Sequence, residues 1–323
     1  TQKLLAAQPK GDGVPLDQDA KPLLDAKDVK VHFPKRRDFF GRPTDWVKAV
    51  DGIDVHIKVG QTLGIVGVGH VGNLVYQKAT ALGIQCLLND PPRARNQAHL
   101  KQTEQTPFVD LETCLTADII TFHTPLTTTG EDPILNLLSA ERLQHIQPHQ
   151  IIINAARGGI INEQAWQQTN TLANVIDCWE NEPTISESLY QTAYLATPHI
   201  AGHSLEAKVA GSTMVYSALC NVWKTQEKTD WKNFLPPPPK PIILSEQATL
   251  QTTLHQLFTR THNIHQDDHA IRASTIKEVH QQYELYRRNY PVYREWHCHS
   301  VQTQNNPTLK KLLHSLGFQT TQP

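Results

Sequence analysis

Three residues near the middle of the chain carry side chains that together could oxidise an alcohol. Arg157 follows an apolar run and precedes two glycines, so its guanidinium could hold a carboxylate by two parallel hydrogen bonds. His199 lies in TPHIAG, where an imidazole could pass a proton at neutral pH. Glu182, in WENEP, could bond His199 and stabilise its imidazolium form. Because hydride removal from an alcohol carbon needs a base for the hydroxyl proton, these three are the candidate catalytic residues.

A glycine-rich turn upstream of these residues has the pattern of a dinucleotide-binding site. An apolar run at 63–66 enters Gly67-Val68-Gly69-His70-Val71-Gly72, which opens a segment of helical periodicity. Gly67 permits the tight turn, Gly69 lets backbone approach a pyrophosphate, and Gly72 lets helix and strand pack closely. The unpaired N–H groups at the helix start would then face the phosphates. The pattern predicts cofactor contacts at Gly67, Gly69 and Gly72.

The acid that closes the next apolar run favours NAD over NADP. Asp90 can accept a hydrogen bond from a ribose 2′-hydroxyl, whereas its charge would repel a 2′-phosphate. The glycine spacing also fits the phosphate-binding loop of nucleotide hydrolases. That loop needs Lys and then Ser or Thr after its second glycine, and this chain has Asn73-Leu74 instead. NAD binding is therefore the preferred interpretation, since hydrolysis would lack its main electrostatic elements.

Short apolar runs recur from residue 61 onward and predict an α/β fold. These expected strands are Leu63–Val66, Gln85–Leu88, Ile119–Phe122, Ile151–Asn154 and Val175–Asp177. Their alternation with helical segments or loops indicates right-handed crossovers and a Rossmann-type, doubly wound parallel sheet over 61–223. Ligands should gather at the carboxyl ends of those strands, where polar residues such as Asp90, Thr124 and Asp177 follow.

The rest of the chain predicts a long helix, a linker and a small second unit. Ser204–Trp223 has apolar residues near helical spacing, and 224–240 contains four consecutive prolines that should make a stiff linker. Residues 241–323 form the expected C-terminal α+β domain. Its expected elements are strands at Ile242–Leu244 and Pro291–Val301 and helices at Gln247–Arg260, Ile276–Arg288 and Leu309–Leu316, with a polar stretch after the first helix.

Bulk properties exclude several classes of function. With 323 residues and a net charge of −1, the chain has no global basic field for nucleic acid or acidic membranes. Its five cysteines are spread without a C-x-x-C pair, which favours reduced thiols in the cytoplasm. No apolar run is long enough to span a membrane. A metal site is not expected either, because the run His297-Cys298-His299 would alternate faces on a strand and could not offer three adjacent ligands.

The first 60 residues differ in character from the rest. Residues 1–21 are polar, lack apolar periodicity and predict a flexible lead-in. Residues 22–60 predict two short antiparallel strands separated by a loop at Pro34–Trp46. The run LLDAKDVKVHFPKRRDFFGRPTDWVKAVDGIDVHIKVGQTLGIVG resembles the opening of the ATPase subunit of peptide-type ABC transporters, and this resemblance covers residues 1–66 including the lead-in. It ends where the phosphate loop of that family would begin.

Motifs downstream of the glycine turn carry a second and more extensive resemblance. NAARGGIIN, DCWENEP and TPHIAGHS, following GVGHVG and FHTPL in this order, resemble the D-isomer-specific 2-hydroxyacid dehydrogenases. LLNDPPRAR, ADIITFHTPLTTTG and the C-terminal YELYRRNYPVYREW are similar to the branch of that family that oxidises 4-phospho-D-erythronate with NAD in pyridoxal phosphate biosynthesis. The resemblance runs from about residue 61 to the end, so it includes the C-terminal domain.

This resemblance implies roles for individual residues. It gives Arg157 and Glu182 as catalytic residues and His199 as the acid/base, with Arg157 and His203 touching a small phosphorylated 2-hydroxy acid. Position 203 commonly holds Tyr in the family, and an imidazole can still donate a hydrogen bond there. Residues 241–323 would form a homodimer, so the cluster of Arg, Tyr and Trp in YELYRRNYPVYREW is expected at an interface. The implied cofactor contacts beyond the glycines are His70, Val71, Asp90, Thr124, Pro125, Ala156, Asp177 and Gly202.

The two resemblances together predict a chimera. The dehydrogenase family places about a hundred residues, most of its substrate domain, before the glycine turn, and the ABC-like segment stands there instead. We therefore expect impaired turnover. We also expect the helix at 204–223 to have apolar surface that is either covered by residues 22–60 or exposed. Two alternatives to an active dehydrogenase are a non-catalytic NAD-binding dimer and an ABC ATPase-derived module without a working phosphate loop.

Overall fold

A computed structural model describes most of the chain. It covers residues 61–97, 106–227, 230–244, 249–273, 278–303 and 306–321, and it gives the backbone course of 22–37 and 43–58. The predicted flexible lead-in at 1–21 lies outside the described residues.

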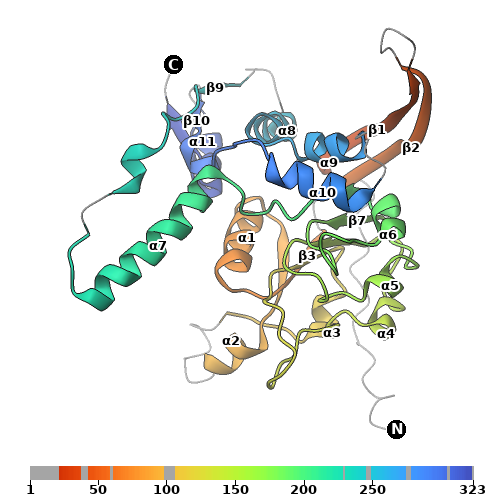
Figure 1. The fold of residues 1–323 in the computed structure, drawn as a ribbon, viewed down its shortest axis with the longest axis horizontal. Coiled ribbons are helices and arrows are strands. Elements are labelled where there is room, and N and C mark those ends of the chain that lie inside the picture. Colours follow the sequence, from red (N-terminus) through yellow and green to blue (C-terminus); the bar gives the residue numbers. More distant parts are fainter. Residues whose placement is uncertain are drawn as a thin grey trace.

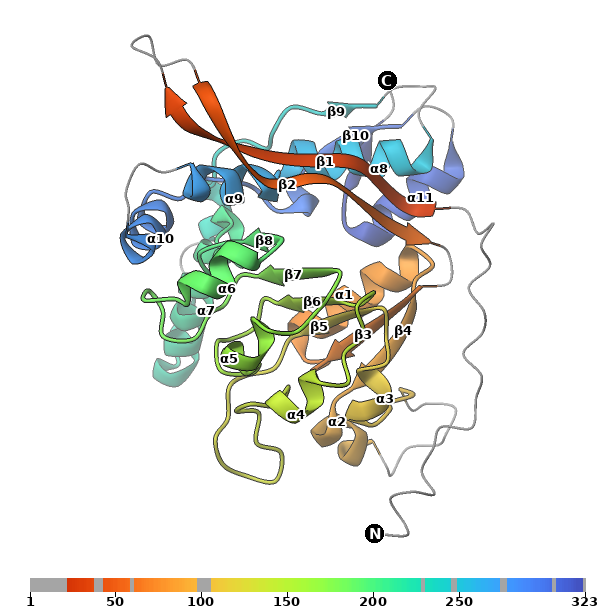
Figure 2. The ribbon, with the colours of Figure 1, turned by 90° about the vertical axis from the view of Figure 1, so that its right-hand side faces the viewer.

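A six-stranded parallel sheet forms the centre of the molecule (Figure 2). The strand order is β4-β3-β5-β6-β7-β8, so the chain passes from β3 to one neighbour and then crosses back to the other. A crevice for ligands is expected where the order reverses, beside the carboxyl end of β3. The strands are β3 (Thr62–Val66), β4 (Gln85–Asn89), β5 (Ile119–Phe122), β6 (Ile151–Asn154), β7 (Ala173–Ile176) and β8 (Leu195–Ala196).

Helices and short helical turns connect these strands. They are α1 (His70–Ala81), α2 (Pro91–Asn96), α3 (Leu111–Cys114), α4 (Ala140–Leu143), α5 (Glu163–Trp166), α6 (Glu187–Thr192) and α7 (Leu205–Trp223). The strands are mostly apolar because both faces of the sheet are covered, and Ile65, Ile120 and Ile176 are fully buried. The predicted Rossmann-type fold is confirmed.

The predicted strands agree with the structure except at its far edge. Four of the five expected strands are found within one residue of their bounds, and β7 begins and ends earlier than Val175–Asp177. The sequence did not reveal β8, because two residues are too few to show a periodic pattern. This omission matters because the segment after β8 carries His199.

The N-terminal segment forms an antiparallel pair, β1 (Pro22–Arg37) and β2 (Pro43–Lys58). The pairing was predicted, but the strands extend into the expected loop, since Pro34 pairs with Trp46. The hairpin runs along α8 (Leu250–Thr261), as Figure 2 shows. Figure 1 places it away from the free end of α7, so it does not cover that end of the helix.

The C-terminal part contains a second, three-stranded parallel sheet in the order β11-β10-β9. Its strands are β9 (Ile242–Ile243), β10 (Ser300–Gln302) and β11 (Gln319–Thr321). Around it lie α9 (Ile264–Arg272), α10 (Val279–Arg288) and α11 (Pro307–Leu316), and two 3₁₀ turns occur at η2 (Trp231–Phe234) and η3 (Trp296–Cys298). The predicted C-terminal helices are found at α8, α10 and α11, with bounds shifted by a few residues.

One expectation about this part is wrong, and one helix was not expected. The strand expected over Pro291–Val301 is reduced to β10, because Trp296 stacks between Phe258 and Phe318 at 4.9 and 5.1 Å and the chain turns there. His297 and Cys298 therefore lie in a 3₁₀ turn and not on a strand. The expected polar stretch after α8 contains α9, whose apolar Ile271 is buried although its sequence is mostly polar.

Helices α9 and α10 pack against the main sheet. Ile271 of α9 and Tyr283 of α10 belong to the same hydrophobic cluster as the sheet residues. Asp268 of α9 accepts a hydrogen bond from the backbone N–H of Ala196 in β8 at 2.8 Å. The buried guanidinium of Arg272 bonds Asp268 at 2.9 Å and also reaches backbone carbonyls of the sheet unit. These contacts hold α10 close to the loop that follows β8.

Helix α7 leaves the body of the molecule and exposes apolar side chains (Figure 1). Met214 is 72 % exposed and Val222 is 74 % exposed, and Trp223 at the end of the helix is also exposed. Ser204 caps the first turn by accepting from the Ala207 N–H at 3.1 Å, so the predicted start of this helix is confirmed.

Candidate active site

The glycine turn between β3 and α1 has the geometry that its sequence predicts. Gly67 adopts φ of +85°, and a Cβ there would lie 2.6 Å from the Thr124 side chain. A Cβ on Gly72 would lie 1.9 Å from the Gly67 carbonyl oxygen, so neither position accepts a side chain. Gly69 has open space in front of it, which leaves room for a ligand to approach the backbone.

The start of α1 is able to receive an anion. Gly69 is its N-cap and offers no side-chain oxygen to the first-turn N–H groups, which include those of His70 and Val71. Both residues are exposed. Beside the turn, the buried hydroxyl of Thr124 has no hydrogen-bond partner among the described residues. An uncapped helix start and an unpaired hydroxyl both fit a bound pyrophosphate dinucleotide such as NAD.

Asp90 links the glycine turn to the end of β4. Its Oδ2 accepts from the Val68 N–H at 2.8 Å, and its Oδ1 accepts from the Arg93 N–H at 3.1 Å and caps α2. An ionised carboxylate has about four acceptor sites, so two remain for ribose hydroxyls. The Arg93 guanidinium donates to the Val68 carbonyl at 2.5 Å and brings a positive charge beside the turn. The charge of Asp90 itself opposes a 2′-phosphate at this place, whereas the nearby guanidinium is bonded to the Val68 carbonyl.

We expect Asp90→Asn to weaken NAD binding about tenfold and to narrow the preference for NAD over NADP. The amide still caps α2 but removes the charge that repels a 2′-phosphate. Titration with NADH and with NADPH measures both effects. Asp110→Asn is the matched control, because Asp110 caps α3 by accepting from the Thr113 N–H and lies on a different helix. An unchanged ratio of the two affinities in Asp90→Asn would contradict the assignment.

Arg157 sits on a tightly packed loop after β6. The Asn154 side chain donates to the carbonyls of Arg157 and Cys178 at 3.0 and 3.1 Å and thereby joins the ends of β6 and β7. A Cβ on Gly158 would lie 1.9 Å from the Trp179 carbonyl oxygen, so the two loops touch through their backbones. The Arg157 side chain is exposed, and its Nη1 donates to the Ala156 carbonyl at 2.6 Å.

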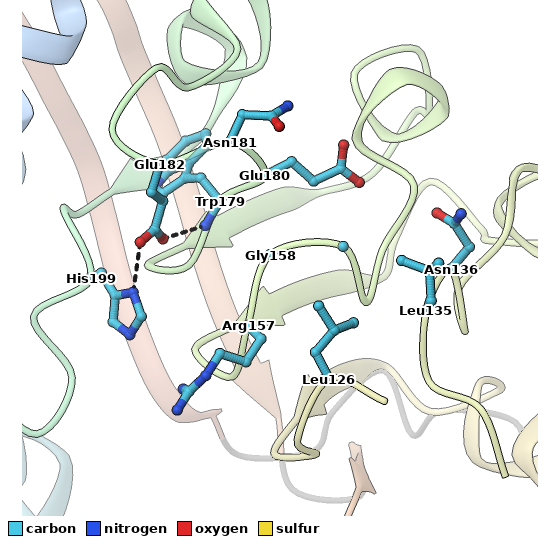
Figure 3. Close-up of a pocket in the computed structure, with 11 residues that line it drawn as sticks. Leu126, Leu135, Asn136, Arg157, Gly158, Trp179, Glu180, Asn181, Glu182 and His199 are labelled. Atoms are coloured by element: carbon cyan, nitrogen blue, oxygen red, sulfur yellow. Dashed lines mark hydrogen bonds and ion pairs between the residues drawn. The ribbon is translucent and has the colours of Figure 1, made fainter. Parts of the chain in front are cut away.

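Glu182 and His199 form a direct pair (Figure 3). The His199 Nδ1 and the Glu182 Oε2 are 2.8 Å apart, while the Glu182 Oε1 accepts from the Trp179 N–H at 2.8 Å. Burial acts to raise the pKa of Glu182, but the bonds from His199 and Trp179 outweigh it and hold the pKa below its ordinary value. Glu182 is therefore ionised at neutral pH and fixes the orientation of the imidazole, so that Nε2 is left for a substrate.

Asp177 holds the loop that carries His199. Its carboxylate accepts from the Thr197 hydroxyl at 2.7 Å and from the backbone N–H groups of Ile200 and Ala201 at 2.8 and 2.9 Å. The His199 N–H also donates to the Asp177 carbonyl at 2.8 Å, and His199 itself adopts φ of +52°. The predicted contact between Asp177 and the nicotinamide stays a prediction. In the structure, the Asp177 carboxylate binds the loop that contains His199.

The three predicted catalytic residues line one pocket of about 520 Å³. Figure 3 shows the Arg157 side chain extending below the ring of His199, with Leu126 and Leu135 on the other side of the pocket. An arginine to anchor a carboxylate and an imidazole held by an ionised partner can together remove a proton from a 2-hydroxy acid. Of the remaining predicted contacts, Gly202 is exposed after the His199 loop, Ala156 is buried beside Arg157, and Pro125 is exposed after β5.

Two groups near the pair were not predicted from the sequence. Arg287 of α10 donates from Nε to the His199 carbonyl oxygen at 3.3 Å, although its cluster was expected at an interface. Cys178 has its sulfur within 4.8 Å of the ligand atoms of Glu182 and His199. Burial, with the charges of Asp177 and Glu182, raises the pKa of Cys178 far above its usual value, so it is a neutral thiol and a poor metal ligand.

Glu163 is a buried acid beneath the loop of Glu182. It is 5 % exposed, and its Oε1 accepts from the Glu180 N–H at 2.6 Å. Burial raises the pKa of Glu163 to about 7; the bond from Glu180 opposes this shift, and the charges of Glu180 and Glu182 add to it. No pattern in the sequence indicates this burial, because a glutamate in the first turn of a helix is ordinarily exposed.

Comparisons with known proteins show the family to which the chain belongs. The family described as D-isomer specific 2-hydroxyacid dehydrogenase, NAD binding domain, matches residues 38–201, and a domain of unknown function, DUF3410, matches residues 234–317. The first match begins inside the segment that resembles an ABC ATPase, and that resemblance and the chimera stay predictions. Among the described residues, no helix is both long and apolar enough to cross a bilayer.

Curated relatives and a solved structure can be compared in more detail. The erythronate-4-phosphate dehydrogenase of Hydrogenovibrio crunogenus is 55 % identical over 259 residues, which cover 80 % of this chain and 68 % of that protein. That of Ruthia magnifica is 47 % identical and covers 73 % of this chain and 63 % of that protein. The D-isomer specific 2-hydroxyacid dehydrogenase of Lactobacillus delbrueckii, complexed with NAD, is 20 % identical, with a TM-score of 0.44 and coverage of 54 % and 57 %.

Proposed function

Because the chain belongs to the D-isomer-specific 2-hydroxyacid dehydrogenase family and carries its NAD-binding domain, we propose that it oxidises the C2 hydroxyl of 4-phospho-D-erythronate to the 2-oxo acid. The observation that supports this most directly is the bonded pair of Glu182 and His199 in one pocket with Arg157. The substrate is suggested by the relatives named erythronate-4-phosphate dehydrogenase. The chain spans about two thirds of the length of those relatives.

The reaction divides among the three residues according to their chemistry. Arg157 binds the substrate carboxylate with two parallel bonds and so fixes the position of C2. His199 accepts the hydroxyl proton at Nε2, and Glu182 at Nδ1 stabilises the imidazolium that forms. NAD supplies the acceptor for the hydride when it is bound. The residues suited to hold it are the first-turn amides of α1, Asp90 and the unpaired Thr124 hydroxyl.

We further infer that turnover is low. Every described residue that lines the pocket comes from residues 126–199, so the NAD-binding domain alone forms the described wall of the pocket. A dehydrogenase site gains rate when a second wall excludes water and orients the substrate. Homodimerisation through residues 241–323 in the cytoplasm also belongs to this proposal, and its support is the resemblance of that region to the same branch of the family.

NADH formation from 4-phospho-D-erythronate tests the proposed function, and Arg157→Lys tests its geometry. Lysine keeps the positive charge but not the planar fork, so we expect kcat/KM to fall roughly tenfold to a hundredfold. Arg142→Lys is the control, because Arg142 is an arginine of α4 that pairs with Glu112 outside the pocket. Binding of NADH without any oxidation of the substrate would favour the non-catalytic NAD-binding dimer instead.

A further inference from the structure

A second pocket, of about 500 Å³, shares Glu182 with the pocket of Arg157 and His199. Arg287 and Arg288 of α10 line it together with His203. Two guanidinium groups beside one imidazole are chemically suited to a phosphate, since arginine matches the geometry of phosphate oxygens. Arg287, Arg288 and His203 have no part in the proton transfer or carboxylate binding that we propose for the first pocket.

The position of these arginines is fixed by packing on both sides of the helix. Tyr283, on the preceding turns of α10, is buried in the core of the main sheet unit. After the helix, the ring of Tyr290 packs edge-on against His203 at 5.9 Å, and the Leu205 N–H donates to the Tyr293 carbonyl at 3.1 Å. The bond from Arg287 to the His199 carbonyl then ties the helix to the catalytic loop. The pocket is thus built from two segments that hold each other in place.

Two guanidinium groups and two carboxylates line the pocket, and the two arginines are left without an ion-pair partner among the described residues. Both Arg287 and Arg288 are exposed. The carboxylates of Glu182 and Glu284 also line the pocket, and Glu182 is directed to His199 and Trp179 by its hydrogen bonds. Burial lowers the pKa of His203, and the charges of Arg287 and Lys208 lower it further, so His203 is neutral and can donate one N–H.

A second observation also points to a ligand. Tyr283 lines this pocket and is only 4 % exposed, and its buried hydroxyl has no hydrogen-bond partner of good geometry among the described residues. Burial, and then the charge of the nearby Glu182, raise the pKa of Tyr283, so the hydroxyl keeps its proton. Glu182 also acts on this hydroxyl as a hydrogen-bond acceptor and contributes to its raised pKa, but the geometry of that contact is poor. A buried donor without a well-aligned partner is costly, and a phosphate oxygen would be a suitable acceptor nearby.

We propose that Arg287 and Arg288 form the subsite for the phosphate of a phosphorylated 2-hydroxy acid whose carboxylate is held by Arg157. His199 contacts the surroundings of both anchors, because it lines the Arg157 pocket and its backbone carbonyl oxygen accepts from Arg287. A four-carbon chain with an anion at each end would then present its second carbon to the imidazole. This inference rests on the proposed function and names the residues that distinguish a phosphorylated substrate from an unphosphorylated one.

Calorimetric binding with the full chain tests the subsite without requiring turnover. The ligands are 4-phospho-D-erythronate, D-erythronate and inorganic phosphate, each titrated in the presence of NADH. We expect the wild-type chain to prefer the phosphorylated acid by about tenfold to a hundredfold, and inorganic phosphate to compete with it. Replacing both arginines with alanine should remove most of that preference. The control replaces Lys310 and Lys311 with alanine, which removes two exposed charges from α11 and should leave the preference intact.

Structural damage and failure of the proposed function give different results. NADH affinity should stay unchanged in the double alanine variant, which shows that the NAD site is intact. Arg287→Gln with Arg288→Gln supplies the same comparison if loss of the bond to the His199 carbonyl lowers the unfolding midpoint of the alanine variant. Two results would overturn the subsite. In the first, the wild-type chain binds the phosphorylated and unphosphorylated acids equally; in the second, both double variants keep the preference for the phosphorylated acid. Binding preference without NADH formation would overturn the dehydrogenase activity and leave the subsite supported.

Discussion

Replacing His199 with asparagine is expected to lower kcat by roughly 10²- to 10⁴-fold, the usual contribution of a general base. Asparagine suits this position because His199 adopts φ of +52°, and Asn tolerates the left-handed region better than most residues. The substitution therefore removes the base without adding backbone strain. Steady-state rates of NADH formation from 4-phospho-D-erythronate measure the effect.

The control for this variant is His145→Asn, which replaces an exposed histidine after α4. NADH affinity and the unfolding midpoint should be the same in both variants and in the wild type. A His199→Asn chain that retains more than about a tenth of the wild-type kcat would show that another group takes the proton.

Glu163→Gln is expected to raise the free energy of unfolding by about 3 kcal/mol at about pH 8 and to leave it unchanged at about pH 4. The folded pKa of about 7 lies above the ordinary value of 4.5, so the folded state holds the proton more firmly than the unfolded chain does. Stability from this group is complete below pH 4.5 and is lost as pH rises to about 7, at about 1.4 kcal/mol per pH unit. A neutral glutamine avoids that loss and can still accept from the Glu180 N–H.

Denaturant unfolding at both pH values measures this difference. Glu141→Gln is the matched control, because Glu141 occupies the first turn of α4 as Glu163 does in α5, but it is exposed. If the Glu163→Gln chain were no more stable than the wild type at the higher pH, then Glu163 would be ionised without penalty, and its burial would have to be compensated by groups other than those described.

The sheet could be predicted because local patterns decide it. Gly67 and Gly72 are required by contacts within their own turn, and the apolar strands follow from a sheet covered on both faces. The start of α7 follows from the cap at Ser204. The elements that were missed depend on distant partners: β8 is held by pairing with β7, and the turn at Trp296 by stacking on Phe258 and Phe318.

The residues of the candidate site also fall into those that local motifs predict and those that depend on distant packing. Arg157, Glu182 and His199 could be named because each lies in a motif at a strand end, and strand ends of a parallel sheet meet at one edge. Arg287 could not be placed beside His199, since the contact depends on how α10 packs against the sheet. The same applies to the buried Glu163, whose unusual environment is created by the loop that contains Glu180.

The carboxylate of Asp177 has a consequence for the motions of the site. Because it accepts from Thr197, Ile200 and Ala201, the segment around His199 is bonded to the first residue after β7. We expect this segment to move together with the end of β7, because local opening of the segment would have to break these hydrogen bonds. The imidazole of His199 would thus be preorganised for proton transfer before the substrate binds. A rate-limiting conformational step would then have to involve another part of the chain.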